Sequence, residues 1–458
     1  MDISSDKYVV MPLEVKVRDF NSRLVLSLEL CKVGFNVIIG SQDIIQSQIH
    51  NLPEAIYFDK SLSRNKLNFF RKIKDLGFII VSQDEEGLCS LFNYERYITQ
   101  RVCNETLDLA DYIFTWGSSE AELIKNKYPK NSKKVVVTGN PRIDLLRTPL
   151  IKSHNPLAEK YRQDYGPYFL FPSSFTVNHA MGSENVNEHL IRMGRVQNKY
   201  DLEKYHTKQK FFEKTYSEYV SLVKKVANEF KDINIIVRPH PSEDHFHWNE
   251  IAKYQSNIKI ISKGDVASWI IGSDLVIHSS CTTGMESFII DKPVISYLPF
   301  TDHEYVKQIS NSVSKVCSTK EGVIECIKDY QKKGSFDDYN RKGLIKYLSQ
   351  HVVNVNGNFS YKLITNYLLK LEIRNKKSFL TLNNTFITKT KREVRKLKDS
   401  FLNPKNLKYA KQKFSGLNQF EIESNIERIT QLQMTKNNFK VKKLDKNLFL
   451  INIQNSNK

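Results

Sequence analysis

The sequence predicts an α/β protein of two doubly wound, Rossmann-like domains in tandem, followed by a basic helical C-terminal tail. Two observations support this prediction. Short apolar runs alternate with amphipathic stretches, as in parallel sheets that are covered by helices on both faces. A polar segment with two prolines, residues 148–156, then interrupts the alternation. We therefore expect domains at residues 1–150 and 151–370 and a tail at residues 371–458.

The expected elements follow from the spacing of apolar residues. The first helix should run from about Asp19 to Gly34, where the apolar positions recur at helical spacing. Strands are expected in the first domain at residues 8–11, 35–39, 56–58, 78–81, 112–114 and 135–137, and in the second at 168–171, 233–237, 258–261, 275–277 and 294–297. Helices of the second domain are expected at residues 216–230, 266–271, 283–290 and 320–332. Two such domains should face a cleft with the carboxyl ends of their strands.

Composition and charge exclude several classes of protein. No run of eighteen apolar residues occurs, and residues 1–16 lack the hydrophobic region of a signal peptide, so we expect a cytoplasmic protein. The six cysteines form no CxxC pair, which argues against structural zinc and a disulfide framework. Residues 371–458 contain 20 Lys and Arg against seven Asp and Glu, so they carry 13 of the 19 net positive charges. Such a segment favours an anionic partner surface.

A histidine between two prolines follows one of the expected strands. Arg238, Pro239, His240 and Pro241 come where open α/β sheets bind ligands, and the prolines restrain the backbone that carries the imidazole. His240 could neutralise a phosphate oxygen, or it could be a solvated turn residue. The nearby His245 and His247 lack cysteine or carboxylate partners at ligand spacing, so no metal site is predicted.

A hydroxyl-rich turn follows the strand expected at residues 275–277. It contains Ser279, Ser280, Thr282, Thr283 and Gly284 and leads into a helix, so its hydroxyls and first amides suit a phosphate. Glu286 stands three residues after Thr283, which is also the spacing of a capping box. Glu286 could therefore hold ribose hydroxyls or cap the helix.

Three adjacent carboxylates, Asp84, Glu85 and Glu86, follow a strand of the first domain and precede Gly87. Mutual repulsion should raise the pKa of at least one, as a general base for a sugar hydroxyl requires. The alternative is a solvated acidic loop. Weaker candidates also lie at strand ends, and structure alone could explain each: for an acceptor or sugar, Glu14, Arg18, Lys60 and Ser61; for donor binding, Ser173, Ser174 and Asn178.

Taken together, these motifs resemble the bacterial surface carbohydrate biosynthesis protein family (capsule and O-antigen polysaccharide). The motifs are residues 84–87, 116–117, 138–142, 238–241 and 279–284. More distantly, they resemble the bacterial sialyltransferases and capsule Kdo transferases of GT-B fold. The resemblance implies inverting, metal-independent transfer from a CMP-activated acidic sugar, such as a nonulosonate or Kdo, without a cofactor. It also implies that Glu85 or Glu86 is the base, that His240 contacts the donor phosphate, and that Ser279 and Ser280 lie beside it.

The tail adds a prediction about location. Within residues 387–401, apolar side chains fall on one helical face among many lysines and arginines. A basic amphipathic helix suits the anionic inner face of the cytoplasmic membrane, where a lipid-linked glycan acceptor would lie. The alternative is a solvated charged helix that packs on the body of the protein.

Three rival functions remain at this stage. A CDP-glycerol-type polyol phosphotransferase would use similar motifs and a similar tail, and product analysis would distinguish it. A non-hydrolysing nucleotide-sugar 2-epimerase needs neither acceptor nor membrane, so the basic tail counts against it. A non-enzymatic nucleic-acid-binding protein is disfavoured, because the tail lacks interleaved aromatic residues. No nucleic-acid partner is therefore expected.

Overall fold

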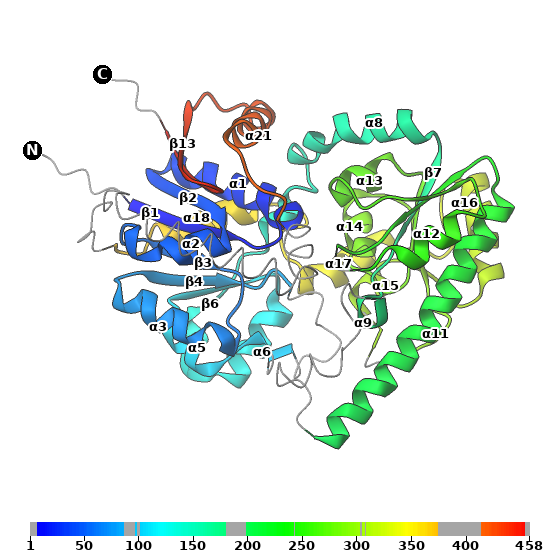
Figure 1. Cartoon of the computed structure of the whole chain (residues 1–458), viewed down its shortest axis with the longest axis horizontal. Coiled ribbons are helices and arrows are strands. Elements are labelled where there is room, and N and C mark those ends of the chain that lie inside the picture. The colour runs from blue at the N-terminus through cyan, green and yellow to red at the C-terminus, as the bar shows by residue number, and fades with distance from the viewer. Residues whose placement is uncertain are drawn as a thin grey trace, which may run out of the picture. The chain divides into compact units, whose positions relative to one another are not determined.

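The computed structural model describes residues 7–86, 97–98, 101–179, 198–241, 243–302, 305–306, 308–373 and 414–453. They group into two compact units (Figure 1). The first unit contains residues 7–153, 345–373 and 414–453, and the second contains residues 154–344. The change of unit after Ser153 falls inside the polar segment where a boundary was expected.

The first unit is built on an eight-stranded sheet with the order β13-β14-β2-β1-β3-β4-β5-β6. The six strands from β2 to β6 are parallel, and β13 and β14 extend the β2 edge in antiparallel pairing. The strands are β1 (Lys7–Leu13), β2 (Phe35–Ser41), β3 (Ile56–Asp59), β4 (Ile79–Gln83), β5 (Tyr112–Thr115), β6 (Val135–Val137), β13 (Phe439–Asp445) and β14 (Leu448–Ile453).

Helices cover both faces of this sheet. Alternate strand residues point to opposite faces, so Val9 packs into one core and Val10 into the other. The helices are α1 (Lys16–Lys32), α2 (Gln42–Gln48), α3 (Leu67–Asp75), α5 (Asn104–Leu109), α6 (Ser118–Lys127), α7 (Pro141–Asp144), α18 (Ser360–Leu368) and α21 (Gln419–Leu432). Short 3-10 helices are η1 (Ile49–Asn51), η2 (Arg64–Lys66) and η4 (Pro129–Lys134), and η5 (Leu150–His154) ends at the change of unit.

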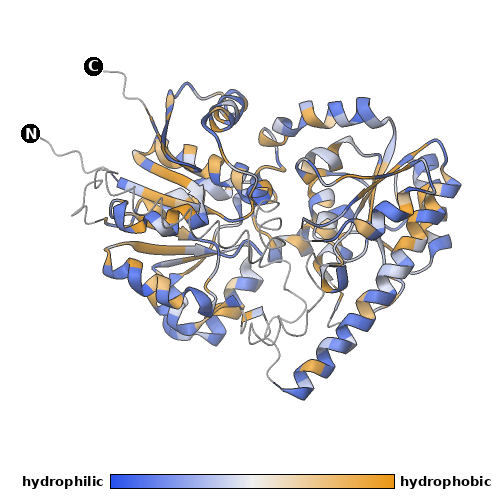
Figure 2. Cartoon of the chain, in the orientation of Figure 1, coloured by the Kyte–Doolittle hydropathy of each residue, from blue (hydrophilic) through white to orange (hydrophobic). Residues whose placement is uncertain are grey.

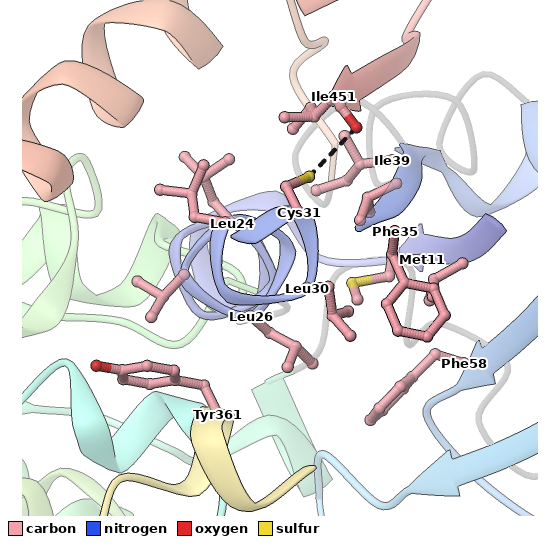
Figure 3. Packing of buried hydrophobic residues seen from close by; sticks show 14 of the residues in the cluster. Met11, Leu24, Leu26, Leu30, Cys31, Phe35, Ile39, Phe58, Tyr361 and Ile451 are labelled. Carbon is pink, nitrogen blue, oxygen red and sulfur yellow. Dashed lines mark hydrogen bonds between the residues drawn. The ribbon is translucent and has the colours of Figure 1, made fainter. Parts of the chain in front are cut away.

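Helix α1 is the centre of one of these cores (Figure 3). Its side chains Leu24, Leu26 and Leu30 are fully buried, because the sheet, α18 and the C-terminal segment pack around the helix. The Cys31 thiol donates a hydrogen bond to the carbonyl of Ile451 in β14, and burial raises its pKa. Residues more than four hundred positions apart therefore share one core.

The C-terminal segment differs from the expected tail. Residues 414–453 form α21, β13 and β14, and β14 pairs with β2. Leu448, Phe449 and Ile451 point to alternate faces of the sheet, and they are buried because both faces are covered by a hydrophobic core. The lysines of this hairpin lie outside the core, as the exposed Lys440 and Lys442 of β13 show. Residues 387–401 of the expected basic helix lie outside the described residues.

The second unit has a six-stranded parallel sheet with the order β12-β11-β10-β7-β8-β9. With the strands numbered from the start of the unit, this is the 3-2-1-4-5-6 arrangement of a doubly wound nucleotide-binding fold. The strands are β7 (Tyr168–Pro172), β8 (Asn234–Arg238), β9 (Ile258–Ile260), β10 (Leu275–His278), β11 (Val294–Tyr297) and β12 (Lys315–Cys317).

The helices of the second unit include a long one, α11 (Lys199–Glu229), which begins well before the expected position. Its C-terminal half packs on the sheet through Tyr219, Leu222 and Val226. The others are α8 (Asn155–Tyr165), α9 (Thr176–His179), α12 (Phe246–Ala252), α13 (Val266–Gly272), α14 (Thr283–Ile290), α15 (Gln308–Ser312), α16 (Lys320–Lys333) and α17 (Arg341–His351), which continues into the first unit.

The hydropathy pattern follows these layers. Figure 2 shows apolar residues along the strands of both sheets and polar residues along the outer sides of the helices. Two Rossmann-like units, as predicted for a GT-B-like chain, are thus present. Within the described ranges, no helix combines the length and apolar character that a membrane crossing requires.

Candidate functional site

The first unit gathers predicted site residues at the carboxyl edge of its sheet. Glu14 follows β1, Lys60 follows β3, and Asp84 to Glu86 follow β4. Strand β1 lies between β2 and β3, so the chain reverses its winding direction beside β1. Open α/β sheets bind ligands outside the strand ends at such a switch point. The three loops therefore meet where chemistry is expected.

Asp84 and Glu86 are both held by Arg101, a residue that sequence reasoning missed. The Arg101 guanidinium donates to both Asp84 oxygens at 2.6 and 2.8 Å and to Glu86 at 2.9 Å. Arg18 donates to the other Glu86 oxygen at 3.0 Å. Glu86 keeps 39% of its side chain exposed, whereas Asp84 keeps 9%. Of the three carboxylates, Glu86 is thus the most accessible.

Glu85 points inward. It accepts a hydrogen bond from Arg23 of α1 at 2.9 Å, and both side chains are 3% exposed. Asn140, in the loop after β6, donates to its second oxygen at 3.3 Å, and the Arg23 guanidinium also lies 4.1 Å from the ring centre of Phe58. Such a buried, paired carboxylate stabilises the site, and a substrate cannot reach it without displacing these partners.

The expectation that repulsion raises a carboxylate pKa is wrong for Glu86. Partial burial acts to raise its pKa, but the charges of Arg101, Arg18 and Lys60 outweigh it and lower the pKa to about 2. Burial acts in the opposite direction on Arg18 and Arg101, but the carboxylates raise the pKa of both guanidinium groups. The acidic motif is therefore a set of ion pairs, in which Glu86 is ionised at neutral pH.

The weaker candidates at β1 and β3 join this network. Glu14 accepts a hydrogen bond from Lys60, and Arg18 lies 3.6 Å from the Glu14 carboxylate. Arg18 also contacts Asp19, whose carboxylate accepts the backbone amides of Glu14 and Val15 where α1 begins. The Ser61 hydroxyl is buried and lies 3.3 Å from that of Ser63, so it belongs to the loop rather than to the accessible network.

Another buried carboxyl group, that of Glu120, is linked to the acidic motif through Trp116. Glu120 of α6 accepts hydrogen bonds from the Tyr97 hydroxyl at 2.7 Å and the Trp116 amide at 2.8 Å. Burial raises its pKa to about 7, and the negative charge of Asp84 adds to the shift. The Trp116 indole in turn donates to the Asp84 carbonyl at 2.6 Å. Sequence reasoning missed Glu120 because one acidic residue in a helix gives no local sign of its burial or of its contact with Tyr97, which lies in another segment.

The second unit places three predicted loops side by side. Strand β7 lies between β8 and β10, so the loops that begin at Ser173, Arg238 and Ser279 follow adjacent strands. The Tyr219 hydroxyl of α11 ties two of the strand ends together through the carbonyls of Pro172 and Ile277, at 3.1 and 2.8 Å. The winding direction reverses between β7 and β10, so this edge is again a switch point.

Arg238 and His240 have different roles in their loop. Arg238 donates to the carbonyls of Lys263 and Gly264 at 2.7 and 2.9 Å, and burial lowers its pKa to about 10. Its guanidinium is thus committed to the loop after β9 and does not point to a donor. His240 is exposed, and Pro241 beside it is partly exposed. His240 is therefore the accessible ionisable side chain of this predicted pair.

Glu243, which sequence reasoning missed, organises two of the loops. It is fully buried, and its oxygens accept hydrogen bonds from the Ser173 hydroxyl at 2.6 Å, the Trp248 indole at 2.9 Å, and the amides of Phe175 and His240 at 3.2 and 3.4 Å. Burial raises the pKa of this carboxyl group. The Ser173 hydroxyl therefore serves the loop.

Of the other two candidates after β7, Ser174 is partly exposed. Asn178 donates to the Gln209 carbonyl and to Glu213 of α11 at 2.8 and 2.9 Å, so its amide group binds the helix. Ser174 is therefore the more accessible hydroxyl in this loop.

The turn between β10 and α14 has a specific backbone. Ser280 adopts a left-handed conformation with φ of 52°, and its hydroxyl accepts a hydrogen bond from Asn311 at 3.1 Å. Thr282 precedes the first helical residue, Thr283, and its side chain makes no capping hydrogen bond. The capping-box alternative for Glu286 required a Thr283 cap, so it does not apply, and Glu286 lies buried in the first turn of α14.

No three His, Cys, Asp or Glu side chains are arranged to hold a metal ion in the part of the chain that the structure describes. Gly87 of the acidic motif lies outside that part.

Comparisons with known proteins show likeness of fold only. No family model and no curated protein matches the chain. Among solved structures, the wall teichoic acid polymerase TagF is 10% identical, covers 80% of this chain and 89% of its own, and has a TM-score of 0.48. The UDP-GlcNAc 2-epimerase from Neisseria meningitidis bound to UDP-GlcNAc is 15% identical, with 80% and 100% coverage and a TM-score of 0.48. A putative UDP-N-acetylglucosamine 2-epimerase from Listeria monocytogenes is 14% identical, covers 82% of this chain and 99% of its own, and has a TM-score of 0.48.

Proposed function

We propose that the chain is an inverting, metal-independent glycosyltransferase that moves a sugar from a nucleotide donor to an acceptor hydroxyl. One observation carries the proposal: loops with an exposed histidine and several hydroxyls follow three adjacent strands at the switch point of the second sheet. Hydroxyl, imidazole and amide donors that converge at strand ends are the groups that a phosphate requires.

The turn 279–283 supplies the donors for the leaving phosphate. The Ser280 oxygen already accepts the Asn311 amide, so its own proton can be directed to a ligand oxygen. The positive end of the α14 dipole follows directly after this turn. His240, when protonated, adds a positive charge from the adjacent loop. These groups would stabilise the charge that develops on the phosphate as the glycosidic bond breaks.

The proposal assigns the acceptor hydroxyl to Glu86. Glu85 is enclosed by Arg23 and Asn140, and Asp84 is only 9% exposed, whereas the Glu86 side chain is 39% exposed. Glu86 is therefore the carboxylate that a hydroxyl can approach. A carboxylate with a pKa of about 2 is a weak base in the free protein. Glycosyl transfer has an oxocarbenium-like transition state, in which the acceptor proton leaves late, so a weak, well-placed base suffices.

We further propose a CMP-activated acidic sugar as donor and a glycan or lipid-linked glycan of a bacterial surface polysaccharide as acceptor. The anionic inner face of the cytoplasmic membrane is the proposed location. The exposed lysines of β13 and of its flanking turns support an anionic surface as partner, and they are Lys436, Lys440, Lys442, Lys443 and Lys446.

The test is product analysis with the full chain and sugars linked to CMP, UDP or GDP. A glycosyltransferase releases the nucleotide and forms a glycoside of inverted configuration. Transfer of donor phosphorus to the product would identify a polyol phosphotransferase instead, and conversion of the donor without acceptor would identify an epimerase.

Variants test the assigned residues. We expect Glu86→Gln and His240→Ala each to lower kcat by about 100-fold or more while the fold is kept. Ser217→Ala is the control, because this exposed serine of α11 lies in the same unit but in none of the predicted site loops. Near-normal turnover by His240→Ala would refute its assignment.

A further inference from the structure

A fully buried histidine, His278, lies beneath the hydroxyl-rich turn. It is the last residue of β10, and its two ring nitrogens face two different segments. Nε2 lies 2.9 Å from the hydroxyl of Ser314, which follows α15. Nδ1 lies 3.2 Å from the amide of Cys281, in the middle of the turn. The imidazole therefore connects the turn to the segment between α15 and β12.

The hydrogen bonds determine the protonation of this ring. The Ser314 hydroxyl donates its single proton to the carbonyl of Ser310 at 2.7 Å. Its oxygen must therefore accept a hydrogen bond from His278, which places the ring proton on Nε2. Nδ1 is then unprotonated and can accept the Cys281 amide. The neutral Nε2–H tautomer satisfies both contacts, whereas a proton on Nδ1 would oppose the Cys281 N–H.

The first turn of α14 packs closely against the ring. A Cβ atom on Gly284, in the first turn of α14, would lie 2.2 Å from His278 Nε2. The glycine thus lets the helix begin directly against the ring. Between ring and helix, Ser280 keeps a left-handed backbone, a conformation that is unfavourable for a residue other than glycine. The Cys281 amide and the Asn311 side chain hold this strained turn from both sides.

We infer that His278 is a positioning residue of the donor site: through the Cys281 amide it sets the turn that presents Ser279 and Ser280. It does not touch the ligand. This inference rests on the proposed function for the statement that the turn holds phosphate. The hydrogen bond by which the ring fixes the turn, from the Cys281 amide to Nδ1, is independent of that function.

Two substitutions separate the two nitrogens. In His278→Asn, the amide oxygen takes the place of Nδ1 and can still accept the Cys281 N–H. In His278→Gln, the longer side chain takes the place of Nε2, so it retains the Ser314 contact and loses the Cys281 contact. Both remove the aromatic ring and should cost similar stability, so each is the matched control for the other.

The first readout is hydrogen exchange of residues 279–284 by mass spectrometry. We expect exchange in His278→Gln to be about tenfold or more faster than in His278→Asn, because a buried N–H loses its acceptor. The second readout is the Kd of CMP, which should weaken by about tenfold in His278→Gln and less in His278→Asn. Ser279→Ala provides the reference for loss of one direct hydroxyl donor.

The outcomes are distinguishable. Equal exchange in the two variants would overturn the role of His278, whatever the activity of the wild-type chain. Faster exchange in His278→Gln together with equal CMP affinities in the wild type and both variants would support the grip on the turn. It would also remove the turn from the donor site, and with it the proposed function.

Discussion

The buried pair of Arg23 and Glu85 allows a quantitative test of the site. Substitution of Arg23 by Met keeps the aliphatic volume but leaves the Glu85 carboxylate, 3% exposed, with Asn140 as its remaining side-chain partner among the described residues. Removal of one partner from a buried ion pair costs about 3–5 kcal/mol, because an uncompensated charge stays in the interior. The lost contact of the guanidinium with Phe58, at 4.1 Å, adds on the order of 1 kcal/mol. We expect Arg23→Met to lose about 4–6 kcal/mol of unfolding free energy in the first unit.

The double variant Arg23→Met/Glu85→Leu is the matched control. It removes both charges and should lie within about 2 kcal/mol of the wild type, since replacing a whole buried pair by apolar groups is often neutral. Urea unfolding, read by hydrogen exchange on peptides of the first unit, measures the change without contributions from the second unit. The reasoning fails if Arg23→Met costs less than about 1 kcal/mol, or if the double variant is as unstable as the single one. Retained transfer by the double variant would show that Glu85 is not the base.

Three further predictions follow from buried groups. The pKa of Glu120 is raised to about 7, so the stability that this group contributes is complete below its unfolded pKa and is lost as the pH rises through 7. Between pH 5 and 8 the wild type should therefore lose on the order of 3 kcal/mol more unfolding free energy than Glu120→Gln, as thermal or urea unfolding at each pH would show. Gly284→Ala should cost about 1–3 kcal/mol through its clash with His278 and weaken CMP binding, and an unchanged Kd would contradict the tight packing. Leu448→Ala should destabilise the first unit by about 2–5 kcal/mol, because this fully buried side chain belongs to the core of that unit. A loss below about 0.5 kcal/mol in urea unfolding, as at a surface position, would contradict the packing of the C-terminal hairpin into that core.

The fold was predictable where the signal is local. Apolar runs predicted the six parallel strands of the first sheet, and three elements, β6, β11 and α14, begin and end at the expected residues. The hairpin of β13 and β14 was missed because the many lysines of residues 436–446 made the segment read as part of a basic tail, although apolar residues alternate within it. Only pairing with β2, four hundred positions away, shows that Leu448 and Ile451 alternate into two cores. A single sequence contains no signal for that pairing.

The candidate site shows the same division between local and distant information. The loops could be predicted, since polar residues after an apolar strand lie at the ligand-binding edge whatever the strand order. The electrostatics could not, because three like charges in sequence predict repulsion, and the sign of the pKa shift at Glu86 is set by cations from other segments. Sequence reasoning selected residues by their position after a strand, yet the buried Glu243 and His278, which it did not select, determine how their loops are held.

This division has a consequence for how the donor site can change. The order of β8, β7 and β10 brings together loops that are about sixty and forty residues apart in sequence, and each is held from below by a buried polar side chain. Glu243 links the loops after β7 and β8, while His278 holds the turn after β10. The two organisers share no hydrogen bond among those the structure describes, so substitutions at them should act additively on stability. If both loops bind one phosphate, the same substitutions should act non-additively on its affinity. That contrast would show that the two loops form one site.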